Sequence, residues 1–459
     1  MIDASRLTHV TNAITAWQQS WGAYEPHPSL QVAPERLAEA LDTYLTRLQG
    51  NYPFFHPRYA GQMLKPPHPV AVLGYLGAML INPNNHALDG GPPTGQMEKE
   101  VVKALAQMVH FPDDTLGHLT SGGTVANLEG LWVARHVHLD KKLGFTDAAH
   151  YTHGRMAEVI GMDTARLAVD ADGRMDVAAL EQRLKEGDIG TIVVTGGTTG
   201  FGTVDPIADI VPVCRSAGVR VHVDAAYGGF YAILAWDDTA RLGEETKRHY
   251  RAVAKCDSIA IDPHKHGLQP YGCGSILFRD PSAGRFYQHD SPYTYFTSDE
   301  LHLGEISLEC SRAGAAAGAL WLTLQVFPLD MTGLGAVLQA GIDAAQQWAD
   351  LLRESAHFDL FMPPELDIVT YFPAMASASA SAIDQRSQSL FHEAMHTDDE
   401  PVFLSVLRVE TERLQRLVPD LAIDQPQARI LRSVLMKPEH ETYVPMLHRR
   451  LETLAQTLA

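Results

Sequence analysis

Apolar and polar residues alternate with two different periods along the middle of the chain. Apolar runs rich in β-branched residues, TIVVTGG at 191–197, VRVHVDAAYGG at 219–229 and SIAID at 258–262, predict buried strands. Segments with apolar residues three to four positions apart, MEKEVVKALAQMVHF at 97–111 and DPIADIVPVCRSAG at 205–218, predict helices. Strands that alternate with helices indicate a mainly parallel sheet covered on both faces.

The two ends of the chain carry other patterns. Residues 1–50 are predicted to be helical, with leucines at helical spacing at 37, 41, 45 and 48. After about Asp330 the pattern predicts a helix over 332–354, a loop over 375–384, strands at 366–373, 401–410 and 428–438, and a final helix at 441–457. We therefore divide the chain into an N-terminal helical segment and loop (1–60), a large domain (61–330) and a small C-terminal α/β domain (331–459).

Composition narrows the function classes. With 459 residues, of which 45% are apolar, the chain is long enough for a large core and for two to three structural units. The formal net charge of −19 argues against a nucleic-acid or anionic-membrane surface. The N-terminus lacks the pattern of a signal peptide, and no apolar run approaches the roughly 18 residues of a transmembrane span, so we expect a cytoplasmic protein with no membrane contact.

Three chemically complementary features stand at predicted strand ends. Lys265 follows the strand at 258–262, where an ammonium is costly to desolvate unless it is paired or neutralised. Asp224 ends the preceding strand and needs a cationic partner for the same reason. A glycine-rich turn, TSGGTVAN at 120–127, opens a predicted helix over 123–144 and offers backbone N–H groups to a phosphate. Because ligands bind at the carboxyl ends of parallel strands, we expect these features in one crevice.

A phosphate cradle, a buried acid and a buried amine suit pyridoxal 5′-phosphate (PLP). Its aldehyde condenses with a lysine, and its ring nitrogen keeps a proton beside a carboxylate. Condensation also removes the buried charge of Lys265. Each feature alone has a simpler interpretation, namely a capping turn, a turn-capping aspartate and a solvated lysine. Their combination in one order favours a PLP site.

Six sequence blocks carry a resemblance to a known family. They are TSGGTVANLEGLW, AAHYTHGRM, GGTTGFGTVDPI, HVDAAYGG, DPHKHGLQPYGCG and LECSRAGAAAGALWL. In order and spacing they resemble the group II PLP-dependent decarboxylases, which include glutamate, aromatic amino acid and diaminobutyrate decarboxylases. The resemblance implies an α/β fold of the aspartate-aminotransferase type (fold type I), in which 61–330 is the large PLP-binding domain. It also implies a homodimer with active sites at the interface, where 1–60 would pack on the partner subunit.

The resemblance assigns a role to each cofactor contact. Lys265 would hold PLP as a Schiff base, and Asp224 would bond the ring nitrogen. Ala226 and His150 would lie against the two faces of the ring. The phosphate would be bound by Gly123, Thr124, Thr199 and His264. Without the resemblance, an ordinary satisfied histidine is the simpler interpretation of His150.

Two blocks depart from the family pattern. HYTHGR at 150–155 stands where the family often has HYSxxK, and it keeps a hydroxyl and a cation. CSRAG at 310–314 stands where the family often has GSRPG, which changes a turn and leaves the role of Arg312 open.

A metal site is not expected. The histidine pairs that resemble metal ligands have no third ligand at zinc spacing; they are His264 with His266 and His136 with His138. The cysteines are far apart and show no CxxC spacing, which also argues against a disulfide framework; they are Cys214, Cys256, Cys273 and Cys310.

The resemblance implies decarboxylation of an L-amino acid to carbon dioxide and a primary amine. The segment 286–305 fits the family loop whose tyrosine protonates Cα, and Tyr293 and Tyr295 are its candidates. Relatives with phenylalanine in this loop tend toward oxidative deamination, so a tyrosine favours simple decarboxylation. The alternatives are an aldehyde synthase or carbon–carbon lyase on the same scaffold, and a catalytically inactive homologue.

The substrate pocket is expected to draw on the N-terminal loops. HPRYAGQM at 56–63 resembles the family block that lines the substrate, which places His56 and Gln62 there, and loop 82–97 of the partner subunit would complete the wall. An acidic substrate would need a cation, for which the candidates are Arg58 and Lys65. An aromatic substrate would need Phe54, Phe55 or Tyr59. Both sets lie in one loop, so the sequence leaves the amino acid open.

Overall fold

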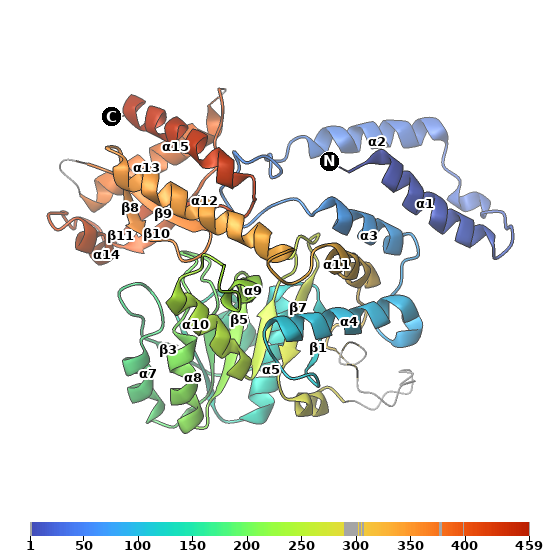
Figure 1. Ribbon diagram of the computed structural model, residues 1–459, viewed down its shortest axis with the longest axis horizontal. Helices are drawn as coiled ribbons and strands as arrows, with labels where there is room; N and C mark the ends of the chain where they lie inside the picture. Colours follow the sequence, from blue (N-terminus) through green and yellow to red (C-terminus); the bar gives the residue numbers. More distant parts are fainter. Residues whose placement is uncertain are drawn as a thin grey trace.

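The chain folds around two β-sheets that differ in size and in strand direction (Figure 1). The computed structural model describes residues 2–288, 302, 304, 307–375, 379–397 and 399–458. The larger sheet has seven strands in the order β1-β7-β6-β5-β4-β2-β3, and the smaller has four in the order β10-β11-β9-β8.

The seven-stranded sheet is mainly parallel, as the alternating pattern predicts. Neighbours from β3 through β6 run parallel, whereas β7 is antiparallel to both β6 and β1. The strands are β1 (Leu116–Thr120), β2 (Lys142–Thr146), β3 (Thr164–Leu167), β4 (Ile189–Thr195), β5 (Arg220–Ala225), β6 (Ser258–Ile261) and β7 (Gly274–Phe278).

Helices cover both faces of this sheet, because successive side chains of a strand point to opposite sides. On β6, Ala260 packs in a cluster with Val133 of α5, whereas Ile259 and Ile261 pack in a different cluster with Ile210 of α8. The helices between Pro92 and Val326 are α4 (Pro92–Met108), α5 (Gly123–Val137), α6 (Thr152–Val159), α7 (Val177–Leu184), α8 (Ile207–Ser216), α9 (Ala232–Ala235), α10 (Glu244–Ala252) and α11 (Gly314–Val326).

The four-stranded sheet is antiparallel and has its own core. Trp348 of α12 is fully buried against residues such as Tyr371 of β9 and Leu431 of β11. The strands are β8 (Phe358–Met362), β9 (Ile368–Pro373), β10 (Ser405–Glu410) and β11 (Gln427–Val434). The helices are α12 (Leu334–Glu354), α13 (Ala380–His396), α14 (Thr411–Leu417) and α15 (His440–Thr457). The chain thus has fold type I architecture, a large mainly parallel sheet followed by a small C-terminal α/β unit.

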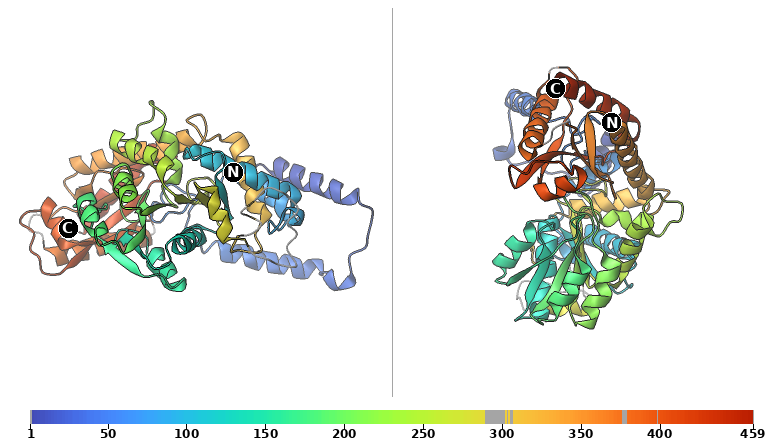
Figure 2. Two further views of the ribbon diagram at one scale, coloured as in Figure 1. Left: turned by 90° about the horizontal axis from the view of Figure 1, so that it is seen from below. Right: turned by 90° about the vertical axis from the view of Figure 1, so that its left-hand side faces the viewer.

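The N-terminal helices stand away from this body. Figure 2 shows α1 (Ala4–Gln19) and α2 (Pro34–Leu48) projecting beyond the two sheets, joined by a long connection. Neither helix has a buried residue, although α3 (Pro69–Met79) contacts α1 and packs on α11. No described helix combines the length and the apolar composition that crossing a bilayer requires.

Three details of the predicted elements are wrong. The helix predicted over 123–144 ends at Val137, and β2 begins at Lys142, because Lys142–Gly144 pair with β4 and bury Leu143 completely. The loop predicted over 375–384 includes the start of α13, whose first turn is capped by the Ser379 side chain. The strands β1, β3, β7 and β8 were not predicted, since each is defined by its pairing with a neighbouring strand. Tertiary pairing decided these segments, not local propensity.

Candidate active site

The carboxyl ends of three neighbouring strands, β4, β5 and β6, open on a cavity of about 290 Å³. The turn before α5 also lines it. Its lining residues are Ser121, Gly122, Gly123, Thr124, Val125, Asn127, His150, Thr152, Thr195, Gly197, Thr199, Asp224, Ala226, Tyr227, Asp262, His264 and Lys265. Every cofactor contact expected from the sequence lies in this set. The sheet therefore brings together residues that are up to 144 positions apart (265 − 121) in the chain, Ser121 and Lys265.

The glycine turn has no room for side chains. Gly122 adopts a φ of +154°, which L side chains rarely adopt. A Cβ on Gly123 would lie 2.6 Å from Asp262 Oδ2, so only glycine lets the turn approach β6 so closely. No described side chain caps the first turn of α5, which leaves the N–H groups of residues 123 and 124 directed out of the helix N-terminus. This geometry suits a phosphate.

Asp224 ends β5 as a buried, fixed carboxylate. Its Oδ2 lies 2.9 Å from His153 Nε2, and its Oδ1 accepts a hydrogen bond from the Ala226 N–H at 3.1 Å. Burial alone raises the pKa of a carboxyl group, but the hydrogen bond of His153 and the charge of Lys265 prevail and hold the pKa of Asp224 well below its usual range. Asp224 is therefore ionised inside the cavity.

Lys265 faces a second buried carboxylate, Asp262. The Lys265 Nζ and His264 Nε2 lie 3.2 Å and 3.4 Å from Asp262 Oδ2. Burial raises the pKa of Asp262 in spite of these two neighbours. Asp262 Oδ1, His264 Nδ1 and Thr195 Oγ1 are buried without a hydrogen-bond partner among the described residues. All three atoms belong to residues that line the cavity, so a polar ligand bound there would have unpaired groups beside it.

His150 lies between α6 and the cavity. Its Nδ1 accepts a hydrogen bond from the Thr152 N–H at 3.4 Å, which orients the ring. Burial lowers the pKa of His150, and this favours the neutral ring at pH 7. Thr152 keeps the hydroxyl that the family motif places two positions after the histidine.

These observations fit PLP. The turn before α5 offers N–H groups to a phosphate, the ionised Asp224 suits a protonated ring nitrogen, and the Lys265 amine suits an aldehyde. The three unpartnered polar atoms also lie on residues that line this cavity. The donor set and the cavity are thus those of a PLP site.

The predicted substrate residues His56 and Gln62 do not line the cavity. The ring of His56 packs on Tyr443 at 5.6 Å between centroids, and Gln62 is exposed. Neither lines the cavity, so their role in substrate binding stays a prediction. Tyr293 and Tyr295 lie outside the described residues.

The side chains considered as determinants of the substrate also do not line the cavity. Arg58 pairs with Glu400 at 2.7 Å, and Phe55 is 73% exposed. Tyr59 is buried with its ring edge-on to Phe54, 4.9 Å between centroids. The fifth candidate, Lys65, donates to the carbonyl of residue 436 at 3.4 Å, and burial lowers its pKa to about 8.

Arg432 of β11 is a cation near the cavity that sequence reasoning missed. Its Nε donates to the carbonyl of Gly200 at 3.1 Å, next to Thr199 in the cavity wall. Only 4% of Arg432 is exposed, and its Nη2 has no partner among the described residues. The signal was available, since an arginine inside the apolar strand sequence ARILRSV demands a polar partner.

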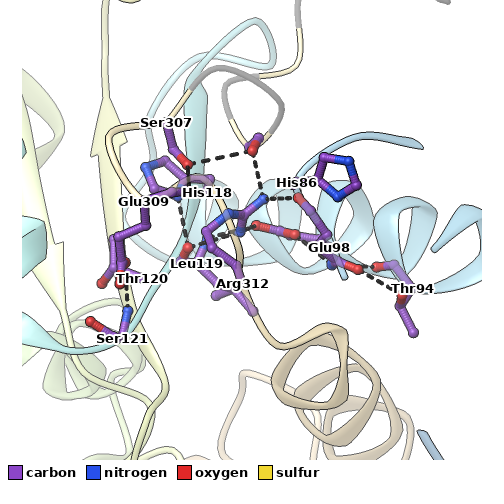
Figure 3. Close-up of polar contacts among 12 residues, drawn as sticks. His86, Thr94, Glu98, His118, Leu119, Thr120, Ser121, Ser307, Glu309 and Arg312 are labelled. Carbon is purple, nitrogen blue, oxygen red and sulfur yellow. Dashed lines mark hydrogen bonds and ion pairs between the residues drawn. The ribbon is translucent and has the colours of Figure 1, made fainter. Parts of the chain in front are cut away.

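Arg312, whose role the sequence left open, is the centre of a buried polar network (Figure 3). Its guanidinium donates to the Glu98 carboxylate and to three backbone carbonyls, those of Leu119 at 3.0 Å, Asn85 at 2.6 Å and Gly304 at 2.7 Å. Glu98 also accepts from the Leu119 N–H and the Asn85 side chain. The network joins α4 to the end of β1, directly before the glycine turn.

The histidines weighed as metal ligands have other partners. His266 bonds Asp367 at 2.9 Å, His138 bonds the carbonyl of Gly190, and the ring of His136 lies on Trp132. Within the described part of the chain, no group of three His, Cys, Asp or Glu side chains has the arrangement of a metal site.

Comparisons with known proteins agree with this chemistry. The model of the pyridoxal-dependent decarboxylase conserved domain matches residues 53–372. The chain is 28% identical to an L-tyrosine decarboxylase of Enterococcus faecium, over 81% of this chain and 78% of that protein. It is also 28% identical to an aspartate 1-decarboxylase of Aliivibrio fischeri, over 78% of this chain and 72% of that protein.

A solved structure supports the fold. Oryza sativa TDC with PLP and tryptamine matches with a TM-score of 0.77 at 18% identity, covering 98% of this chain and 97% of that chain. Since the domain model covers well over half of the sequence and the cavity has the donor set of a PLP site, this chain belongs to the pyridoxal-dependent decarboxylases and is a PLP-dependent carboxy-lyase.

Proposed function

We propose that the chain removes the α-carboxylate of an L-amino acid as carbon dioxide and releases the primary amine. The observation that carries this proposal is that Lys265, Asp224 and the glycine turn line one cavity. When bound, PLP supplies an electron sink for the negative charge left at Cα. The residues of the chain bind it, orient it and hold protons at its edges.

Each contact has a proposed task. Lys265 holds the cofactor covalently, and Asp262 keeps the Lys265 amine in place through the 3.2 Å contact. Asp224, ionised and buried, holds a proton on the ring nitrogen. His150 and Ala226, which both line the cavity, would lie against the two faces of the ring. The phosphate is bound by the N–H groups of the turn and by Gly123, Thr124, Thr199 and His264.

The substrate end of the site draws on other elements. Arg432 is the proposed partner of a substrate carboxylate, because its Nη2 has no partner among the described residues and its Nε bonds the carbonyl of Gly200, next to Thr199. His56 and Gln62 are proposed to line the side-chain pocket, and Tyr293 or Tyr295 to protonate Cα. Phenylalanine at the protonating position would test this assignment.

The experiment measures carbon dioxide and amine from a panel of L-amino acids that includes tyrosine and aspartate, since the relatives divide between these classes. We expect one class to react and Lys265→Ala to lose both activity and the visible absorbance of lysine-bound PLP. The matched control is Lys255→Ala, because Lys255 is exposed and outside the cavity. Stoichiometric aldehyde and hydrogen peroxide in place of amine would overturn the proposal.

The proposed assembly is a homodimer built on the N-terminal helices. α2 presents a stripe of leucines that no other described part of the chain covers, Leu37, Leu41, Leu45 and Leu48, exposed by 59%, 49%, 47% and 45%. An uncovered apolar stripe of this length indicates an interface. We expect Leu41→Asp with Leu45→Asp to reduce the mass in light scattering from dimer to monomer. The control Leu139→Asp, on another exposed leucine, should stay dimeric, and a wild-type monomer would contradict the assembly.

A further inference from the structure

His153 does not line the cavity, but its side chain bonds a residue that does, Asp224. His153 Nε2 lies 2.9 Å from Asp224 Oδ2, and the two side chains are 0% and 7% exposed. His153 is the second residue of α6, three positions after His150. A buried hydrogen bond to a charged group is among the stronger contacts in a protein.

The surroundings fix how the His153 ring is protonated. Its Nδ1 is buried and has no hydrogen-bond partner among the described residues. A proton on Nδ1 would be buried without an acceptor, which is costly, whereas a proton on Nε2 is donated to the Asp224 carboxylate. The ring of Phe145, 6.0 Å away between centroids, adds an apolar neighbour on one side. The geometry therefore favours the tautomer that donates from Nε2.

This donor completes the fixation of Asp224. The Ala226 N–H occupies Oδ1 and His153 occupies Oδ2, so neither oxygen can turn away. Each carboxylate oxygen has a second lone pair, which remains available toward the cavity. His222, the histidine on β5, cannot replace His153, because both of its nitrogens are already bonded, to Ser258 and Asn127.

We propose that His153 is a positioning residue that acts through Asp224: its Nε2–H holds the carboxylate ionised and oriented, so that the ring nitrogen of bound PLP stays protonated. The inference rests on the proposed role of Asp224. Three charged or titratable side chains face the same carboxylate from other elements, His150, Asp262 and Lys265, and all of them line the cavity. His153 is distinct because it reaches the far side of Asp224 without touching the cavity.

The test compares two substitutions of nearly equal length, His153→Gln and His153→Met. Glutamine keeps an N–H donor and methionine does not. The holoenzyme is loaded with PLP carrying ¹⁵N in its ring, and nitrogen NMR reports whether that nitrogen is protonated. We expect His153→Met to shift the resonance toward unprotonated pyridine and to weaken PLP binding by about 10- to 100-fold, the effect of losing a hydrogen bond to a charged group. His153→Gln should stay near wild type in both.

His118→Met is the matched control. His118 bonds Glu129 at 2.8 Å with both side chains fully buried, yet neither residue lines the cavity. The control should lose comparable stability and keep the wild-type nitrogen resonance. If His153→Met keeps a protonated ring nitrogen, or if His153→Gln and His153→Met behave alike, the inference fails. Asp224→Asn distinguishes failure of this inference from failure of the proposed role of Asp224, because an unchanged resonance in that variant would reject the role of Asp224 itself.

Discussion

Two buried charge networks lie on either side of the same turn. On one side the crevice cluster, Asp224, Asp262, His264 and Lys265, opens on the cavity at the carboxyl ends of the strands. On the other side the Arg312 network, Arg312 with Glu98 and its backbone partners, ties α4 to the end of β1 (Figure 3). Both are largely shielded from water, and both contain ion pairs.

The two networks differ in how completely their polar atoms are paired. In the Arg312 network both oxygens of Glu98 accept hydrogen bonds and both terminal nitrogens of Arg312 donate, which leaves only Arg312 Nε without a partner among the described residues. In the crevice cluster, one oxygen of Asp262 and one nitrogen of His264 have no partner among the described residues. The carboxylate of Glu98 is thus fully bonded within the fold, whereas that of Asp262 keeps an unbonded oxygen in the wall of the cavity.

Breaking the closed network should have the largest effect on stability. Arg312→Leu leaves Glu98 as an uncompensated buried charge, and such a loss costs about 3–5 kcal/mol of unfolding free energy. Urea unfolding followed by circular dichroism measures it. The double variant Arg312→Leu with Glu98→Leu should recover much of the loss, because both charges are then gone. Equal losses in the single and double variants would show that the charge is not the cause.

Breaking the open cluster should instead reduce activity. Asp224→Ala removes the proposed charge opposite the ring nitrogen, and we expect kcat to fall roughly 10²–10³-fold, the range for removal of one preorganised electrostatic contact. Amine production under saturating PLP measures it. Asp163→Ala, on an exposed aspartate, serves as the control. If Asp224→Ala lost only stability and kept kcat, the two networks would not differ in kind.

Stability should also depend on pH in different ranges for groups near the crevice and for the Arg312 network. Burial lowers the pKa of His222, on β5 below the crevice, from its ordinary 6.5 to about 3. Below pH 6.5 the unfolded chain therefore binds a proton that the folded chain does not, and stability falls as pH falls, by about 1.4 kcal/mol per pH unit. His222→Gln should reduce this slope between pH 6.5 and 4.5.

The Arg312 network responds in a lower pH range. Burial of Glu98 opposes ionisation, but the charge and hydrogen bond of Arg312 prevail, and the pKa of Glu98 lies below its ordinary 4.5. Its stabilisation is complete above that pH and is lost as pH falls through the lowered value. Thermal melts at intervals of half a pH unit, on wild type and His222→Gln, test the separation; parallel curves above pH 4.5 would contradict it.

A surface pair supplies the smallest expected effect. Arg248 and Asp209 form two hydrogen bonds, at 2.8 Å and 2.7 Å, with side chains 43% and 45% exposed. A double-mutant cycle with alanine should give about 0.2–1 kcal/mol and should weaken in high salt. A coupling as large as that of Arg312 with Glu98 would show that burial does not set the scale.

The cofactor side of the site was predictable from the sequence. The order of strand, acid, strand and lysine places Asp224 and Lys265 at one sheet edge whatever the loops do, because parallel strands end together. The glycine turn was predictable as a phosphate-binding turn, and the structure gives the reason for its glycines: Gly122 has a φ of +154°, and a Cβ on Gly123 would meet Asp262. The antiparallel strand β7 between β6 and β1 was not predicted, because its pairing depends on contacts distant in sequence.

The substrate side could not be predicted in the same way. His56 and Arg58 lie in one loop whose residues contact the small sheet unit, and their directions are set by Tyr443 and Glu400, nearly 400 and 350 positions away. Arg432 approaches the cavity only because β11 lies beside the loop at Gly200. Such contacts follow from the docking of the two sheet units and not from any local motif.

The sequence by itself determined the chemistry of this protein: one lysine, one acid and one glycine turn, in an order that parallel strands must bring to a single crevice. The tertiary structure alone decided which buried polar side chains have all their oxygens hydrogen-bonded and which keep an unbonded oxygen. Glu98 and Asp262 are both buried acids beside cations, and only the neighbours that folding delivers leave one fully bonded and the other with a free oxygen. The reason is physical, since the free energy of a buried charge depends on groups within a few ångströms, and these come from anywhere in the chain.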